Sequence, residues 1–333
     1  MIKSPVLVIG CARSGTTLLY TLLSEVSDLW SIGYESREII ERFHAPATRG
    51  WESGALAAGD LTDQSQAWML HAFETSAAPG SYWRRVNALR TWLNGSGWYR
   101  GIKRRGRGES PGAIAGAALP GAGLGVMRSL ARLRRTLLPP RSPIRLLEKT
   151  PENCLRLPFL QALFPDAQVI FLIRDGRANV HSLLEGWRQP RLFPGYKTPV
   201  RVNSPGQTRG RWAFTLIPGW RELVDRPLIE ICARQWVACN EAVLAYAAGP
   251  GGLPVLTVRY EDLIADPDET LQRIGRFLDL PPAAIPALGR GLPEINTVSV
   301  PDREKWRAEA DALASVAHLM TPLMARLGYS IEI

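Results

Sequence analysis

The sequence has little cysteine, and what it has is widely spaced. The four cysteines are Cys11, Cys154, Cys232 and Cys239. None forms a Cys-x-x-Cys pair or shows the spacing of metal ligands, so neither a disulfide framework nor a metal site of that type is indicated. Their neighbours are typical of a hydrophobic core. We therefore expect reduced, buried thiols in a cytosolic enzyme.

Long apolar runs are also missing. No stretch approaches the ~18 consecutive apolar residues of a membrane span. The first ten residues lead directly into a loop motif that cleavage of a signal peptide would remove, so we expect no export segment and a cytoplasmic protein. Hydrophobic residues make up 46% of the chain and charged residues 21%, which is typical of a soluble globular protein. The 333 residues suffice for one large domain or two ordinary ones.

Acidic residues are almost absent from one segment. Residues 100–145 hold eleven Lys or Arg and a single acid, Glu109, which gives this segment a net charge of +10. The whole chain carries +9. The basic character therefore belongs to one segment and not to the fold as a whole.

Alternating apolar segments predict an α/β fold. Apolar runs predict strands at 5–10, 145–150, 167–174 and 253–260. The first, third and fourth are near-continuous Val/Ile/Leu, which is typical of parallel strands covered on both faces. Helical patterns lie at 15–27, 153–164, 176–187, 228–248 and 267–279. We predict one domain over 1–333, a three-layer fold containing a phosphate loop, with a mainly parallel central sheet flanked by helices. Two long insertions, 45–144 and 188–225, interrupt it.

The first strand runs into a glycine loop that lacks the expected lysine. "GCARSGTT" (10–17) has the Gly-x-x-x-x-Gly frame of a nucleotide triphosphatase loop, but Thr16 stands where that signature has Lys. Its backbone N–H groups and the following helix N-terminus favour an anion. Arg13 adds a planar fork suited to a tetrahedral oxyanion. A sulfonyl group carries less charge than a phosphoryl group, so we expect no metal.

A second anion motif lies about 160 residues further on. "IRDGRANVHS" (173–182) places Arg174 at a strand end and Ser182 two helical turns later, with Asp175 as a helix cap. Both Arg174 and Ser182 are in position to reach a phosphate separate from the one in the first loop.

Together the two motifs resemble the sulfotransferases that use 3′-phosphoadenosine 5′-phosphosulfate (PAPS). The resemblance covers roughly 1–40, 145–187 and 228–310, and is strongest to the bacterial and tyrosylprotein branch with a glutamate base. It implies that Arg13, Ser14, Gly15, Thr16 and Thr17 bind the phosphosulfate. It further implies that Arg174 and Ser182 bind the 3′-phosphate, which is retained in the product 3′-phosphoadenosine 5′-phosphate (PAP).

The same resemblance suggests the catalytic groups. "IGYESREIIERF" (32–43) resembles the Gly-Glu-Glu-Thr-Arg motif of tyrosylprotein sulfotransferases, with Glu35 at the base. None of the four histidines lies in a segment like the His motif of the cytosolic small-molecule branch. Lys149, in "LLEKTPENC" (146–154), resembles the family's Lys-x-Pro element and would stabilise charge beside Arg13. We expect direct in-line transfer without metal or covalent intermediate.

Three further residues are predicted near the nucleotide. Tyr260 in "VRYEDL" (258–263) resembles a strand-end tyrosine beside the nucleoside, although packing explains it equally well. Ser299 and Lys305, six residues apart, resemble a Ser…Lys pair that closes over the cofactor in the tyrosylprotein branch. The Arg-Lys-Gly motif of the small-molecule branch is missing.

The insertions are expected to supply the acceptor site. The basic segment 100–145 has three interpretations: it steers an anionic acceptor, contacts the anionic inner face of a membrane as a peripheral protein, or is a solvated lid. The sequence leaves the acceptor open among glycan, lipid, peptide and small metabolite.

Two other functions compete. A P-loop small-molecule kinase would need a lysine in the loop, where Thr16 stands. A non-enzymatic polyanion-binding protein would use 100–145 but would leave both anion motifs unexplained. Nucleic acid is disfavoured because aromatic residues in that segment are sparse.

Overall fold

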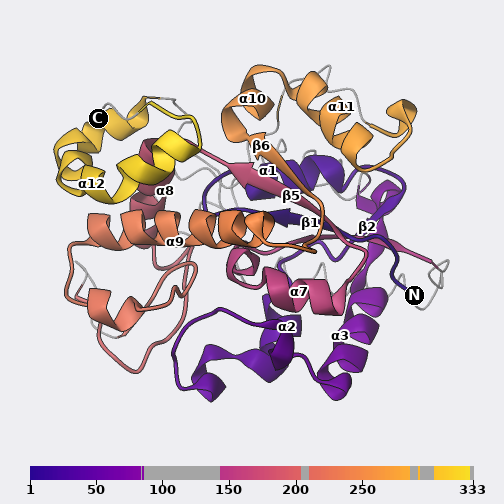
Figure 1. The fold of residues 1–333 in the computed structure, drawn as a ribbon, viewed down its shortest axis with the longest axis horizontal. Helices are drawn as coiled ribbons and strands as arrows, with labels where there is room; N and C mark the ends of the chain where they lie inside the picture. The colour runs from indigo at the N-terminus through magenta and orange to yellow at the C-terminus, as the bar shows by residue number, and fades with distance from the viewer. Residues whose placement is uncertain (84, 86–142, 204–209, 286–291, 293–303, 331–333) are drawn as a thin grey trace, which may run out of the picture.

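A computed structural model describes residues 1–83, 85, 143–203, 210–285, 292 and 304–330 of the chain. Within these residues six strands form one sheet in the order β3-β2-β4-β1-β5-β6. Figure 1 labels β1, β2, β5 and β6. The strands are β1 (Val6–Ile9), β2 (Leu29–Ser31), β3 (Ala78–Pro79), β4 (Arg145–Lys149), β5 (Gln168–Ile173) and β6 (Val255–Arg259).

The sheet is parallel except at one edge, where β3 runs antiparallel to β2. In β1 at its centre, Val8 lies opposite Lys149 of β4 and Ile170 of β5. Every residue of β1 is fully buried because helices cover both faces, and this explains the unbroken Val/Ile/Leu run. The four predicted strands are confirmed as β1, β4, β5 and β6. The short strands β2 and β3 were not predicted.

Helices form the two outer layers, which confirms the predicted three-layer α/β fold (Figure 1). One face packs against α1 (Thr16–Leu23), α10 (Tyr260–Ala265) and α11 (Pro267–Phe277). The other packs against α2 (Arg37–His44), α3 (Asp63–Ser76), α7 (Leu157–Leu163), α8 (Gly176–Trp187), α9 (Leu228–Ala248) and α12 (Ala310–Arg326). Short 3₁₀ turns are η1 (Pro46–Arg49), η2 (Ala58–Asp60), η3 (Pro151–Leu155), η4 (Trp220–Leu223), η5 (Pro282–Ala284) and η6 (Lys305–Glu309).

Tryptophans of the second insertion belong to the core. The rings of Trp212 and Trp220 lie 5.5 Å apart, and Trp212 lies 5.4 Å from Trp187 of α8, measured between ring centroids. All three are almost completely buried. Part of insertion 188–225 is therefore fixed to the sheet by aromatic packing. Of the basic segment 100–145, all but residues 143–145 lies outside the described residues.

A buried arginine joins both insertions to the core. Arg156, completely buried, donates from Nε to the Gly54 carbonyl at 2.8 Å and from Nη2 to Glu41 Oε1 at 2.9 Å. The Tyr196 hydroxyl donates to the same Glu41 oxygen at 2.6 Å. The Gly54 amide in turn donates to the Leu216 carbonyl at 2.7 Å. One guanidinium thus links α2 with segments from the first and second insertions.

Candidate active site

The predicted site residues gather at the carboxyl end of the sheet. Arg13 follows β1, Glu35 follows β2, Lys149 ends β4, Arg174 follows β5 and Tyr260 follows β6. The carboxyl ends of parallel strands share one edge of the sheet, and ligands of open α/β sheets bind there. Arg13 and Tyr260, which are 247 residues apart in the chain, thereby reach one region of the molecule.

The first loop adopts a conformation that requires its second glycine. Gly15 has φ of 99°, in the left-handed region, and α1 begins at the next residue. A Cβ atom on Gly15 would lie 2.4 Å from the ring of Tyr260. Arg13 also has a positive φ, 69°. The Ser14 amide donates within the turn to the Cys11 carbonyl at 3.1 Å, and the N-terminus of α1 follows directly, a position that favours an anion.

Hydrogen bonds connect the two anion motifs directly. Arg13 Nε donates to Ser182 Oγ at 3.2 Å, and Arg174 Nη1 donates to the backbone carbonyl of Arg13 at 2.9 Å. The Arg174 guanidinium lies over the ring of Tyr260, 4.5 Å from its centroid. The structure therefore brings together Arg13, Arg174, Ser182 and Tyr260, which the sequence places in three distant segments.

This cluster concentrates positive charge. Burial, reinforced by the charge of Arg174, lowers the pKa of Arg13 to about 10, so Arg13 stays protonated at neutral pH. In the described part of the chain, neither Arg13 nor Arg174 forms an ion pair with a carboxylate. Two neighbouring guanidinium groups that form no ion pair within the described residues favour an anion beside them, although the charge of Glu185 also acts on Arg13.

Two buried polar atoms of the cluster lack a protein partner. Ser14 Oγ and Arg174 Nε find no hydrogen-bond partner among the described residues. A buried polar group without a partner costs free energy, and in native proteins it usually has a ligand or water to satisfy it. Both atoms therefore fit a bound anion.

Lys149 and Glu35 form a second cluster beside the first loop. Lys149 Nζ donates to Glu35 Oε1 at 2.7 Å and to Thr17 Oγ1 at 3.2 Å. Lys149 is almost buried, with 5% of its side chain exposed, whereas 43% of the Glu35 side chain is exposed. A cation and a carboxylate thus lie together at the start of α1.

A buried carboxyl that sequence reasoning missed holds this cluster in place. Glu148 Oε1 accepts hydrogen bonds from the hydroxyls of Ser36 and Thr150, both at 2.6 Å, and Oε2 accepts from Asn153 Nδ2 at 2.8 Å. Burial raises the pKa of Glu148. The signal was a single acid within the apolar strand "RLLEK". Through these hydrogen bonds Glu148 fixes the backbone on either side of the Lys149–Glu35 pair.

The predicted Ser…Lys pair near the C-terminus is only partly described. Ser299 lies outside the described residues. Lys305 donates to Glu185 Oε1 at 2.9 Å, and Glu185 lies one helical turn after Ser182 on α8. The structure thus places Lys305 beside the helix that carries Ser182, with no contact to the first loop among the described atoms.

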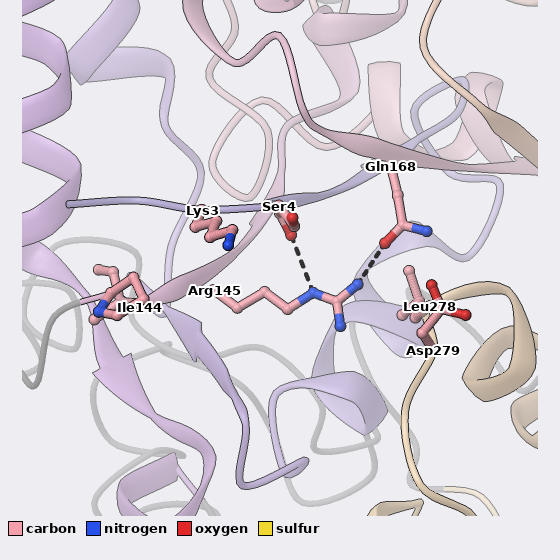
Figure 2. Close-up of a pocket in the computed structure, with 8 residues that line it drawn as sticks. Lys3, Ser4, Ile144, Arg145, Gln168, Leu278 and Asp279 are labelled. Atoms are coloured by element: carbon pink, nitrogen blue, oxygen red, sulfur yellow. Dashed lines mark hydrogen bonds between the residues drawn. The ribbon is translucent and has the colours of Figure 1, made fainter.

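A separate hollow of about 520 Å³ lies at the other end of the sheet (Figure 2). There Arg145, the first residue of β4, donates from Nε to the Ser4 carbonyl at 3.0 Å and from a second nitrogen to the Gln168 side chain. None of the predicted site residues lines it. Ligands of parallel sheets bind at the carboxyl ends of strands, so we assign no role to this hollow.

The amino-acid sequence of this chain is similar to known protein families and individual proteins. A model of the sulfotransferase family matches residues 5–284. The chain belongs to the sulfotransferase family. The matched range includes each predicted site residue except Ser299 and Lys305, and this confirms the resemblance inferred from the two motifs.

Individual sulfotransferases share low sequence identity with this chain. Protein-tyrosine sulfotransferase A of Caenorhabditis elegans is 27% identical over 137 residues, which cover 41% of this chain and 28% of that protein. The nodulation protein NoeE of Sinorhizobium fredii is 27% identical over 201 residues, 55% of this chain and 44% of that protein. This chain spans less than half the length of the curated relatives it matches. A solved sulfotransferase of Alicyclobacillus acidocaldarius is 13% identical, with coverage of 99% and 98% and a TM-score of 0.44.

Among the described residues, no helix has the length and apolar character needed to cross a membrane. Nor does that part of the chain hold a group of three or more His, Cys, Asp or Glu side chains arranged around a metal position.

Proposed function

We propose that this protein is a sulfotransferase that moves the sulfuryl group of PAPS to a hydroxyl or amine of an acceptor. The observation that carries the proposal is the hydrogen-bonded contact between the two anion motifs, in which Arg13 binds Ser182 and Arg174 binds the Arg13 carbonyl. A nucleotide with anionic groups at both its 5′ and 3′ positions matches two adjoining cationic positions.

The residues of the first cluster fit such a nucleotide. Following the family pattern, the loop residues Arg13, Ser14, Gly15, Thr16 and Thr17 would surround the phosphosulfate. Arg174 and Ser182 would hold the 3′-phosphate, and Tyr260 would lie beside the nucleoside. The buried, unpartnered Ser14 Oγ and Arg174 Nε would gain hydrogen-bond partners from the ligand.

The second cluster fits the chemistry of transfer. PAPS supplies an activated sulfuryl group, whose bond to the 5′-phosphate breaks as a bond to the acceptor forms. Glu35 would take the acceptor's proton as general base. Lys149 and Arg13 would stabilise negative charge on the sulfonyl oxygens and the departing phosphate. Ser299 and Lys305 would close over the nucleotide from the C-terminal side.

The insertions 45–144 and 188–225 would supply the acceptor site. An anionic acceptor would match the charge of residues 100–145. Because several relatives are named protein-tyrosine sulfotransferases, a peptide tyrosine is one acceptor to assay.

Calorimetric titration with PAP, compared with ATP plus Mg²⁺, tests the proposed function. We expect micromolar or tighter binding of PAP that is unchanged by EDTA, because the two arginine positions match its two phosphates. Preference for Mg-ATP over PAP would instead support the small-molecule kinase and overturn the sulfotransferase proposal.

Substitution Gly15→Ala tests the loop itself. We expect PAP affinity to fall about tenfold or more and the free energy of unfolding to fall by about 1–3 kcal/mol, because a Cβ at positive φ is strained and this one also meets the Tyr260 ring. Calorimetry and urea denaturation measure the two effects. Gly59→Ala is the matched control, since no atom lies within 4 Å of its added Cβ. Equal behaviour of the two variants would contradict the predicted loop geometry.

A further inference from the structure

The Lys149–Glu35 ion pair places two proposed catalytic groups in contact with each other. Lys149 Nζ lies 2.7 Å from Glu35 Oε1 and 3.2 Å from Thr17 Oγ1, so the same ammonium contacts both the base and the anion loop. The Lys149 side chain is only 5% exposed. The ammonium also lies 6.0 Å from the centroid of the Tyr20 ring.

Neighbouring hydrogen bonds show that this pair is built into the fold. The Ser36 amide donates to Thr150 Oγ1 at 2.8 Å, and the Ser36 hydroxyl donates to Glu148 Oε1 at 2.6 Å. Ser36 follows Glu35, while Glu148 and Thr150 flank Lys149. Each member of the ion pair is thus fixed through its sequence neighbours, and the contact is more than a chance pairing of surface side chains.

The pair conflicts with both proposed roles. The Glu35 Oε1 atom that accepts the hydrogen bond from Lys149 is occupied and cannot at the same time contact the proton of an acceptor hydroxyl. Likewise, an ammonium that is neutralised by a carboxylate attracts a phosphosulfate less strongly. In this arrangement Lys149 occupies the proposed base, and Glu35 reduces the attraction of Lys149 for an anion.

We propose that the nucleotide and Glu35 compete for Lys149, so that nucleotide binding draws the ammonium away and frees Glu35 to act as base. This inference rests on the proposed function. It makes the base available only when the sulfuryl donor is in place, and it favours binding of the donor before productive binding of the acceptor. By reciprocity, removing the Glu35 charge must strengthen nucleotide binding.

Calorimetric titration of PAP into four proteins tests the competition: wild type, Glu35→Gln, Lys149→Gln and the double variant. We expect Glu35→Gln to bind PAP about three- to fivefold more tightly, the upper part of the range for an ion pair with one exposed partner. Lys149→Gln should bind more weakly. The double variant should bind PAP with the same affinity as Lys149→Gln, because Glu35 can weaken PAP binding only through the Lys149 ammonium.

Glu38→Gln is the matched control, since it removes one exposed negative charge from the first turn of α2. It should bind PAP within twofold of wild type. Circular dichroism and urea denaturation check that each variant folds, and Glu35→Ala should change the affinity in the same direction as Glu35→Gln.

Whether Glu35→Gln strengthens or weakens PAP binding decides the inference. Weaker or equal PAP binding by Glu35→Gln would mean that Glu35 positions Lys149 for the nucleotide, which overturns competition. A gain that persists in the double variant would show a general charge effect and overturn it equally. In both cases tight PAP binding by the wild type would leave the proposed function standing, whereas failure of the wild type to bind PAP would remove the proposed function itself.

Discussion

Arg174→Ala should weaken the binding of PAP by about 100-fold or more. Its guanidinium is the proposed 3′-phosphate contact, and Nη1 also fixes the loop through the Arg13 carbonyl. Removing one partner of a desolvated, charge-assisted contact costs about 2–5 kcal/mol, and 2.8 kcal/mol corresponds to about 100-fold. Calorimetric titration with PAP measures the loss, and thermal unfolding checks that the variant is folded.

Two comparison variants separate contact with the phosphate from charge alone. Arg174→Lys keeps the charge but loses the planar fork, so its affinity should lie between those of wild type and Arg174→Ala. Arg188→Ala, which removes a half-exposed arginine paired with Glu309 at the end of α8, should leave PAP affinity within about twofold. If Arg174→Ala also bound PAP within threefold of wild type, the assignment of the 3′-phosphate site would be wrong.

Arg156→Ala should lower the free energy of unfolding by about 3–5 kcal/mol, the usual cost of breaking a buried ion pair from one side. The substitution leaves the buried Gly54 carbonyl without its donor and Glu41 without one of its cations. It also opens a cavity, because Arg156 is completely buried. Urea denaturation followed by circular dichroism measures the change.

Arg234→Ala serves as the comparison. Arg234 pairs with Glu230 one turn away on α9 and is 42% exposed, so its loss should cost no more than about 0.5 kcal/mol. A loss below 1 kcal/mol for Arg156→Ala would show that the hydrogen bonds of its guanidinium do not anchor the insertions.

The anion loop and its fold were predictable because their signal is local. The glycine pattern of residues 10–17 and the apolar run before it occupy one continuous segment, and the order strand, loop, helix carries the geometry. The same holds for the Asp175 cap, whose side chain accepts from the Arg177 amide at 2.9 Å as the motif implies. Apolar runs likewise indicated the strands β1, β4, β5 and β6, of which β6 lies at an edge of the sheet.

Contacts between distant segments could not be predicted from the sequence. Lys149 and Glu35 are 114 residues apart, and their approach depends on β2, a strand of three residues with no pattern of its own. Glu148 could be seen as an acid in an apolar strand, and two of its donors, Thr150 and Asn153, follow it closely, but the third, Ser36, is 112 residues away. Such partners are fixed by tertiary packing and by the need to satisfy a buried carboxyl, which no local periodicity records.

The junction at Arg156 has a consequence for how this scaffold can be re-engineered. Since Gly54 of the first insertion and Tyr196 and Leu216 of the second meet at one buried point, the two insertions are not independent modules. A chimera that exchanges only one of them with a relative would place a foreign segment against a native one at this junction. Exchanged together with α2, the two insertions would bring their own complementary partners. Because the insertions are proposed to supply the acceptor site, we expect acceptor specificity to transfer only when both are exchanged together.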